Sequence, residues 1–506
     1  MKRFITLLLA LVMLFAIMGT GTAVALDTSE YVELIVYQFG EPEADAQLVI
    51  DALNEKLKVD LNCTLKFYWI PWTEYQSTYA MLLTGGEPVD IVYTANWTPF
   101  VEHAQKGAFL PLEELLPAYA PICYSRFDEV DWVECSYDGH IYALPSYFTM
   151  VLPDGVMYRN DLIKKYGLDP INSVPTLEAY LQAVKDNEPD IIPFHLSGTL
   201  DRGVMQLFWF ENNWAGFTPL LDKFLAYPVS AAQENLRDVF CYVDTPEFEE
   251  FCKMTKDWAD KGFWSKSALS NQVPSYDSMP IGRSALSIAH LDRLKGDIGD
   301  KIFADNPEWE PTAWFPFDNL GYLFQAATLQ DATALPRNCR YPERALAVLD
   351  LLINDREYFD LHYYGFEGVH YVLDEQGNIT LPEGVSAQTN GFNPGALMNW
   401  NFRNMDLWRE YANPNQWPDF LPARERARAA AVKDRLNAFQ LNRDSIEAEL
   451  AAIAQLDDQY MKPLLYGAAD LSTLEEFRAQ LRVAGLEKVL EEVQRQINEY
   501  ADLYGY

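Results

Sequence analysis

The first hundred residues of the chain alternate between short apolar runs and amphipathic stretches. The runs VELIVY at 32–37, NCTLKFYWI at 62–70 and VDIVY at 89–93 predict three strands, because β-branched and aromatic residues dominate them. Between these runs, apolar residues recur at helical spacing in 44–58 and 73–83 and predict two helices. Strand, helix, strand, helix, strand in this order predicts a parallel sheet with right-handed crossovers.

Helical patterns with one apolar face return later in the chain. In YPERALAVLDLLINDREYFDLHYYGFEGVHY, residues 341–371, Pro342 suits a first helical turn, where its missing N–H has no partner to lose. Leu346, Leu349 and Ile353 follow at helical spacing, so one face of this helix must be buried. The C-terminal quarter is also predicted to be helical, with an apolar stripe of Leu486, Val489, Leu490, Val493, Ile497 and Tyr500.

Several of these blocks resemble those of a known family. They are the YPERAL helix with its YG-EG-HY turn, GGEPVDIVY at 85–93, GHIYALP at 139–145 and FRAQLRVAGLEKVLEEVQRQ at 477–496. In this order they resemble the family 1 extracellular solute-binding proteins of ABC importers, in the clade with an additional C-terminal domain of unknown function. The resemblance implies an α/β, two-lobed, type II periplasmic-binding-protein-like fold with hinge crossings and a helical C-terminal addition. It also implies a protein that binds and carries a solute and is not an enzyme.

The same resemblance implies a domain organisation. Residues 1–25 are a signal peptide, and residues 26–147 together with 319–371 form lobe one. Residues 148–318 form lobe two. The C-terminal region, 372–506, is mostly helical and packs on lobe two.

The N-terminus is typical of an export signal. Lys2 and Arg3 precede an apolar stretch at 4–18, and Ala23-Val24-Ala25 forms a small-residue cleavage site. A membrane anchor is the alternative, but the stretch is short for a span. The first cysteine is Cys63, so no lipidation cysteine follows the signal. We expect an exported protein that is extracellular, at the cell surface or periplasmic.

Charge and composition exclude some classes of partner. With 39 basic and 74 acidic residues, the formal net charge is −35. Such a surface repels phosphate backbones, so nucleic acid is not expected as a partner. A hydrophobic content of 49% with 14% aromatic residues is enough to build large cores, which argues against disorder.

The cysteines and histidines give no reason to expect a metal or a cofactor. The six cysteines include two pairs close in sequence, Cys123 with Cys135 and Cys241 with Cys252, which could form disulfides. The alternative is that all six are unpaired and buried. No C-x-x-C is present and the six histidines do not cluster with the cysteines, so zinc is not expected. The predicted hairpin at 371–381 lacks the acidic spacing of a calcium loop.

Candidate ligand contacts come from loops that follow the predicted strands, because ligands of open α/β sheets bind beyond the carboxyl ends of the strands. In lobe one these residues are Glu41, Trp72, Glu74, Asn96 and Trp97. Lobe two and the crossings contribute Tyr147, Phe148, Arg202, Trp209, Trp214, His290 and Asp292. For each tryptophan the alternative is a place in the core, and for His290 a structural role.

Trp400 completes the set of candidates. It lies in MNWNFRN, which resembles a W-x-F-G-N segment near the cleft in this clade. Arg403 stands where the resemblance implies a glycine, so the local backbone here departs from the pattern.

These residue types favour a carbohydrate ligand. An aromatic plane covers the C–H face of a sugar ring, and Asp, Glu, Asn and Arg bind its hydroxyl groups. The resemblance implies a monomer that closes around a small-molecule solute and delivers it to the permease subunits of an ABC transporter. The alternatives are a binding protein for peptides or amino-acid derivatives, a secreted carbohydrate-active enzyme and an adhesion protein. Motifs of hydrolases, P-loops and dinucleotide sites are absent from the sequence, but a glycosidase needs only two carboxylates.

Overall fold

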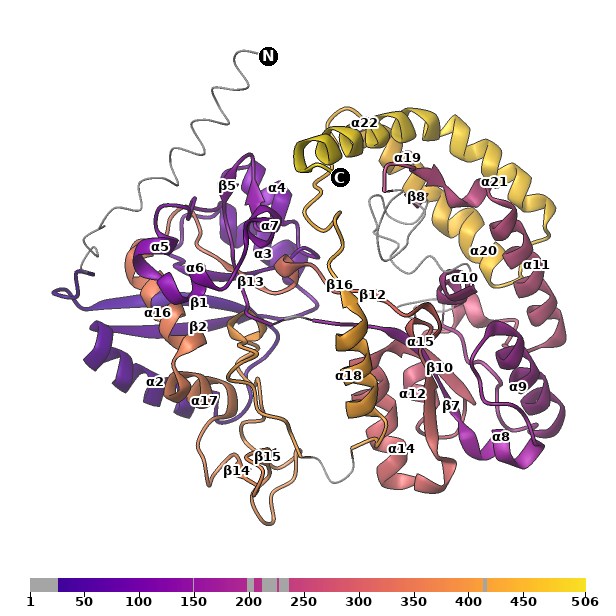
Figure 1. Ribbon diagram of the computed structural model, residues 1–506, viewed down its shortest axis with the longest axis horizontal. Coiled ribbons are helices and arrows are strands. Elements are labelled where there is room, and N and C mark those ends of the chain that lie inside the picture. Colours follow the sequence, from indigo (N-terminus) through magenta and orange to yellow (C-terminus); the bar gives the residue numbers. More distant parts are fainter. Residues whose placement is uncertain (1–25, 149, 198–203, 212–224, 227–235, 413–415) are drawn as a thin grey trace. The chain divides into compact units, whose positions relative to one another are not determined.

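The computed structural model describes residues 26–148, 150–197, 204–211, 225–226, 236–412 and 416–506 (Figure 1). The predicted signal peptide, 1–25, lies outside them. The chain divides into two compact units. Unit 1 contains Met1–Phe148, Asp331–Leu373 and Leu381–Trp408, and unit 2 contains Thr149–Gln330, Asp374–Thr380 and Arg409–Tyr506.

A five-stranded sheet forms the centre of unit 1, in the order β2-β1-β3-β13-β6. The strands are β1 (Val32–Phe39), β2 (Cys63–Ile70), β3 (Ile91–Thr94), β6 (Leu144–Pro145) and β13 (Ala332–Ala334). β1 is parallel to both β2 and β3, which confirms the predicted parallel pairing. β13 is antiparallel to β3 and to β6, an arrangement that local sequence patterns did not indicate.

The helix between β1 and β2 covers the sheet with its apolar face. Helix α2 (Ala46–Leu61) buries Val49, Leu53 and Leu57, the face that its helical spacing predicts. Its Asn54 also protects the edge strand β2. The Asn54 Oδ1 accepts from the Leu65 N–H at 2.7 Å, and Nδ2 donates to the Leu65 carbonyl at 3.0 Å. These bonds satisfy backbone groups that an edge strand otherwise leaves open.

The 341–371 block forms two helices of unit 1, as predicted. Helix α16 (Pro342–Asn354) starts at Pro342 and buries Leu346, Leu349 and Ile353, and α17 (Arg356–Tyr364) follows. The other elements of unit 1 are α3 (Tyr75–Thr84), α4 (Phe100–Gln105), α5 (Leu116–Tyr119), α6 (Pro121–Ser125), α7 (Glu129–Glu134), β4 (Ser136–Tyr137), β5 (His140–Ile141), β14 (Val372–Leu373) and η6 (Trp400–Phe402).

Unit 2 has a smaller, antiparallel sheet in the order β10-β7-β11. Its strands are β7 (Asp154–Arg159), β10 (Leu286–His290) and β11 (Pro311–Trp314). The described helices of unit 2 before residue 420 are α8 (Asn160–Tyr166), α9 (Val174–Asn187), α10 (Met205–Glu211), α11 (Pro246–Lys261), α12 (Ser275–Ser278), α13 (Leu291–Arg293), α14 (Asp300–Asp305) and α15 (Phe317–Leu320). Short elements are β8 (Leu225–Ala226), β9 (Phe240–Cys241), β12 (Leu323–Phe324), β15 (Ile379–Thr380), β16 (Ala431–Val432), η1 (Tyr242–Asp244), η2 (Ala268–Ser270), η3 (Leu294–Gly299), η4 (Pro307–Trp309) and η5 (Thr328–Gln330).

The C-terminal helices are α18 (Phe420–Ala430), α19 (Glu447–Leu456), η7 (Asp457–Met461), α20 (Lys462–Leu465), α21 (Ser472–Val483) and α22 (Leu486–Tyr504). Those from α19 onward share one hydrophobic core with α8–α11 of unit 2, whereas α18 packs in a second cluster with Met157, Phe315 and Trp417. The predicted stripe of α22 is confirmed, since Leu486, Val489, Val493 and Ile497 are buried.

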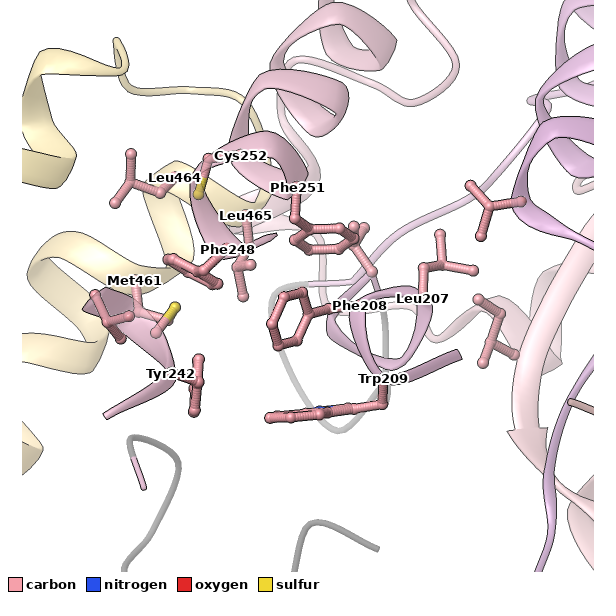
Figure 2. Close-up of a cluster of buried hydrophobic side chains, with 14 of the residues drawn as sticks. Leu207, Phe208, Trp209, Tyr242, Phe248, Phe251, Cys252, Met461, Leu464 and Leu465 are labelled. Carbon is pink, nitrogen blue, oxygen red and sulfur yellow. The ribbon is translucent and has the colours of Figure 1, made fainter. Parts of the chain in front are cut away.

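Figure 2 shows one part of this core, which we call the unit 2 cluster. It joins α10, η1 and α11 to the C-terminal region, and its labelled members are Leu207, Phe208, Trp209, Tyr242, Phe248, Phe251, Cys252, Met461, Leu464 and Leu465.

All six cysteines are unpaired. Five are buried and Cys339 is partly buried, so the alternative of free, buried thiols is the one that the structure supports.

Candidate functional site

The carboxyl ends of three parallel strands meet at one edge of the unit 1 sheet. β1 ends at Phe39, β2 at Ile70 and β3 at Thr94. The loops that follow these strands hold the lobe-one candidates, as the sequence predicted. This edge is where open α/β sheets bind their ligands.

Six aromatic rings gather at this edge, and we call them the aromatic cluster: Phe39, Trp72, Tyr75, Tyr93, Trp97 and Trp400. Trp72 stacks on Trp400 with ring centroids 5.7 Å apart and an interplanar angle of 24°. Trp97 lies 6.2 Å from Trp72 and 5.7 Å from Tyr93. The structure therefore brings together three of the predicted contacts, although Trp400 is more than 300 residues from the other two in sequence.

The cluster has a buried base and an exposed top. Phe39 and Tyr93 are buried, whereas Trp72 is 41% and Trp97 37% exposed. Large aromatic side chains normally bury most of their surface. Two neighbouring indoles that stay exposed on a buried aromatic base form a surface suited to an apolar ring face.

Gly40 makes room for this arrangement. Its φ is +98°, a conformation that residues with a Cβ rarely adopt. A Cβ at this position would lie 2.9 Å from Met398 Cγ and 3.3 Å from Trp72 Nε1. The glycine after β1 therefore sets how closely the Trp72 loop approaches the segment around Met398.

Buried asparagines hold the Trp400 segment in unit 1. Asn401 accepts from Gln38 Nε2 at 3.1 Å and donates to Thr333 Oγ1 at 2.7 Å, so it joins the segment to β1 and β13. Asn404 donates to the Ile353 carbonyl at 2.8 Å. These bonds explain why Leu381–Trp408 belongs to unit 1, whereas the sequence assigned 372–506 to a single C-terminal region.

A third asparagine connects to a buried histidine. Asn399 donates to the His362 carbonyl at 3.1 Å and to Nδ1 of the same imidazole. His362 Nε2 donates to the Leu352 carbonyl at 2.9 Å, so Nδ1 is the acceptor and the ring is neutral. Burial lowers the pKa of His362 to about 4, which keeps this anchor uncharged at neutral pH.

Polar candidates surround the cluster. Glu41, Glu74 and Asn96 are exposed, each one or two residues from a ring of the cluster or from Gly40. Carboxylates and amides in these positions can accept from and donate to hydroxyl groups of a bound molecule. Their roles as ligand contacts stay predictions.

Tyr147 and Phe148 lie in a neighbouring group within unit 1. The Arg126 guanidinium is 4.3 Å from the Tyr147 ring centroid. Phe148 packs on Trp408 at 5.0 Å and lies under the Arg403 guanidinium at 4.6 Å. Neither ring belongs to the aromatic cluster, but Arg403 connects Phe148 to it through a bond to the Trp400 carbonyl.

The candidates of unit 2 are placed differently. Trp209 is 9% exposed and packs 4.8 Å from Phe208 and 5.1 Å from Tyr242 in the unit 2 cluster (Figure 2). The apolar helix α10 carries it inward, which favours the core alternative over a ligand contact. His290 Nδ1 accepts from the Arg293 N–H and caps α13, in which Asp292 is exposed. Arg202 and Trp214 lie outside the described residues.

Sequence reasoning missed the base of the cluster and its support. Phe39 and Tyr93 are aromatic residues at or next to the ends of strands, and that position was a usable signal. The bond between Arg403 and Asp331 joins residues 72 positions apart, and no local pattern marks it.

A serine–histidine pair in unit 2 bears on the alternative of a secreted enzyme. His195 Nδ1 is hydrogen-bonded to the Ser278 hydroxyl, and Nε2 faces the amide nitrogen of Asn271 at 2.9 Å. An amide NH₂ only donates, so Nε2 is the acceptor and Nδ1 carries the proton. Burial and Arg283 lower the pKa of His195 and favour this neutral form. The imidazole therefore donates to Ser278 and does not act as its general base.

Among the described residues, no three His, Cys, Asp or Glu side chains are grouped closely enough to hold a metal ion. In the same part of the chain, no helix has the length and apolar character needed to cross a membrane.

Two family models match the chain. The model for the bacterial extracellular solute-binding protein family matches residues 40–358, more than half of the chain. A model for a domain of unknown function, DUF3502, matches residues 435–502. Both matches confirm the resemblance that the sequence blocks indicated.

The chain is also similar to characterised proteins along nearly its whole length. A carbohydrate ABC transporter substrate-binding protein of Streptococcus pneumoniae serotype 4 is 22% identical over 483 residues, 94% of this chain and 92% of that protein. Among solved structures, the N-glycan transport solute-binding protein NgtS of S. pneumoniae has a TM-score of 0.74 at 20% identity, with 94% of this chain and 99% of that chain covered. An HMO-binding, ABC-transporter-associated solute-binding protein of Bifidobacterium longum infantis has a TM-score of 0.71 at 16% identity, covering 93% and 99%. These likenesses confirm the predicted two-lobed, type II fold.

Proposed function

The chain belongs to the family of bacterial extracellular solute-binding proteins, and on this premise we propose that it captures an oligosaccharide or a glycoside and delivers it to the permease subunits of an ABC transporter. The observation that carries the proposal is the aromatic cluster, with Trp72 and Trp97 exposed at the carboxyl ends of the parallel strands. The names of the S. pneumoniae relatives, one for carbohydrate and one for N-glycan transport, support the same class of solute.

The chemistry of the cluster fits a sugar better than a charged or purely apolar solute. A pyranose ring has an apolar C–H face, which an indole plane covers, and a rim of hydroxyl groups. Glu41, Glu74 and Asn96 stand next to the rings and supply acceptors and donors for this rim. Tryptophan covers a large area and loses little rotamer entropy on binding, because only two side-chain angles are fixed.

The proposal assigns unit 1 and unit 2 to the two lobes. Solute bound to the lobe that carries the aromatic cluster shifts the population from open to closed, and the permease recognises the closed form. His290, Asp292, Arg202 and Trp214 are the proposed contacts from lobe two. The protein acts as an exported monomer after removal of a signal peptide at 1–25, and it binds its solute without chemical change.

A ligand screen tests this function. We expect thermal unfolding to shift upward with one of Man₅GlcNAc, kestose, maltotriose or a milk trisaccharide, and not with trialanine. A ligand at one hundred times its Kd adds about 2.7 kcal/mol to the free energy of unfolding. The ligand should be recovered unchanged after incubation. A response to trialanine alone would favour a peptide carrier, and conversion of the saccharide to a product would contradict a binding-only role.

A matched pair of variants locates the binding surface. Trp97 and Tyr68 lie in the same unit and are both 37% exposed, but Tyr68 pairs with Tyr37 on β1, outside the aromatic cluster. We expect Trp97→Ala to weaken saccharide binding about ten- to a hundredfold in calorimetric titration. Tyr68→Ala should change the Kd less than twofold. Equal effects of the two substitutions on the Kd would show that the aromatic cluster is not part of the binding site.

A further inference from the structure

A buried ion pair lies directly behind the aromatic cluster. Asp331 and Arg403 are both more than nine-tenths buried, and Arg403 Nη2 donates to Asp331 Oδ2. The Tyr93 hydroxyl donates to the other carboxylate oxygen, Oδ1. Burial and then the Asp331 carboxylate raise the pKa of Tyr93, so the phenol keeps its proton and remains a donor. One carboxylate therefore joins a ring of the cluster to a guanidinium.

The two ends of this network reach two rings of the aromatic cluster, Trp97 and Trp400. The Tyr93 ring centroid lies 5.7 Å from that of Trp97 and 6.5 Å from that of Trp400. Arg403 Nε donates to the Trp400 carbonyl at 3.0 Å. Trp400 is thus held from its backbone by Arg403, and Trp97 contacts the network through the ring of Tyr93.

The network also touches the points where the chain enters and leaves unit 1. Phe148 is the last residue of the first segment of this unit, and Asp331 is the first residue of the second. The Arg403 guanidinium lies over the Phe148 ring, and the Ser146 N–H donates to the Asp331 carbonyl at 2.9 Å. Trp408, at the end of the last segment, packs on Phe148. Phe148, Asp331 and Trp408, each at the end of a unit 1 segment, therefore belong to one network of contacts.

We propose that Arg403 is a positioning residue, which through Asp331 and Tyr93 fixes Trp97 and Trp400 in one arrangement and ties that arrangement to the crossing segments. The proposal rests on the proposed function for its consequence, that solute contact at the rings is coupled to movement at the crossings. A buried guanidinium is costly without a partner, so the pair is stable only in the geometry that satisfies both ions. Lysine cannot replace the fork that serves the carboxylate and the Trp400 carbonyl together.

Fluorine NMR of the full chain labelled with 5-fluorotryptophan tests the positioning without any ligand. The 13 tryptophans give separate probes, and Trp97→Phe and Trp400→Phe assign the two resonances in question. We expect Arg403→Lys to broaden both resonances at least twofold relative to the median of the others. Tyr93→Phe, which keeps the ring and loses only the bond to Asp331, should broaden Trp97.

Tyr79→Phe is the matched control. Tyr79 is equally buried, packs on Phe39, and donates its hydroxyl to the Tyr93 carbonyl at 2.8 Å. It has the same hydroxyl to lose but does not bond to Asp331. This variant should leave the Trp97 and Trp400 line widths unchanged. If Arg403→Lys broadens the Trp400 resonance alone, the proposed transmission to Trp97 is refuted. It is also refuted if Tyr93→Phe and Tyr79→Phe give the same line widths. This second comparison remains decisive if Arg403→Lys does not fold.

A binding measurement then tests the consequence. With the saccharide that stabilises the wild type, Tyr93→Phe should raise the Kd three- to tenfold, and the decrease in radius of gyration at saturation should be smaller than in the wild type. Tyr79→Phe should stay within twofold and compact fully. Equal Kd values and equal compaction for the two variants would overturn the coupling. If the wild type binds none of the saccharides, the proposed function fails, while the line widths of the ligand-free protein still decide the positioning.

Discussion

Two groups of aromatic residues, one in each unit, are built from the same side chains and have opposite surroundings. In the aromatic cluster of unit 1, Trp72 and Trp97 keep about two-fifths of their surface exposed above buried rings. In the unit 2 cluster, Trp209 is 9% exposed and packs on Phe208 and Tyr242, in a core that also contains residues of α11 and the C-terminal helices. Both groups contain Phe, Trp and Tyr, so residue type does not explain their different exposure. The difference comes from position, since a loop after a parallel strand presents a ring to solvent and an apolar helix turns it inward.

The supports of the two groups differ as well. The Trp400 segment is held by hydrogen bonds from buried asparagines and by the Arg403–Asp331 pair. The unit 2 cluster is held by apolar packing between segments more than 200 residues apart in sequence. Polar anchors fix a unique arrangement, because each donor must meet its acceptor, whereas apolar packing supplies stability with less directional constraint. We therefore expect substitutions in the unit 2 cluster to affect mainly stability and those in the aromatic cluster mainly binding.

The largest expected effect is on stability in unit 2. Phe248→Ala removes a fully buried ring between Phe208 and Tyr242 and should lower the free energy of unfolding by about 3–5 kcal/mol. Urea unfolding followed by circular dichroism measures it. At a temperature where the variant is folded, its Kd for the saccharide should change less than threefold. A loss of saccharide binding without a loss of stability would contradict the structural role of the unit 2 cluster.

The buried His362, which holds Asn399 in unit 1, should make the stability of the protein depend on pH. His362 has a pKa of about 4 in the folded chain and about 6.5 when unfolded, so between these values only the unfolded chain takes up the proton. Stability should therefore fall as the pH is lowered from 6.5 to 4, by about 3 kcal/mol for this group. The pH dependence of wild type minus that of His362→Gln isolates the effect in calorimetry. Identical pH profiles would show that the buried imidazole does not contribute in this way.

A smaller effect is expected at the turn beside Trp72. Gly40→Ala places a Cβ at positive φ against Met398 and the Trp72 indole, and should cost about 1–2 kcal/mol of stability. It should also weaken saccharide binding, because Trp72 must shift. Gly86→Ala is the control, since its Cβ would meet no atom within 4 Å. If the two variants have the same Kd and the same stability, Gly40 does not set the position of Trp72.

Much of this fold follows from local patterns. Strand and helix spacing predicted β1, β2, β3, α2 and α16, and the apolar stripe of α22. The rule that ligands bind beyond strand ends then predicted that the loops of Trp72 and Trp97 would converge. These features depend on residues near one another in sequence, where periodicity and turn signals are direct expressions of burial.

The remainder depends on contacts that local patterns do not encode. β13 pairs with β3 from a segment more than 230 residues away, and Arg403 meets Asp331 through tertiary packing alone. Trp209 has the same aromatic signal as Trp97 but lies in an apolar helix, and the packing of α10 against α11 places its ring in the core. The base of the aromatic cluster was missed because Tyr93 was counted as a strand residue and Phe39, in the predicted turn, was not considered as a ring at a strand end.

A crystal structure of the protein with the saccharide that most raises its thermal stability tests the central claim most directly. The account predicts a pyranose or furanose ring lying flat on Trp72 or Trp97, with its hydroxyl groups within hydrogen-bond distance of the loop carboxylates or amide. A saccharide bound elsewhere, with both indoles still exposed to solvent, would contradict it.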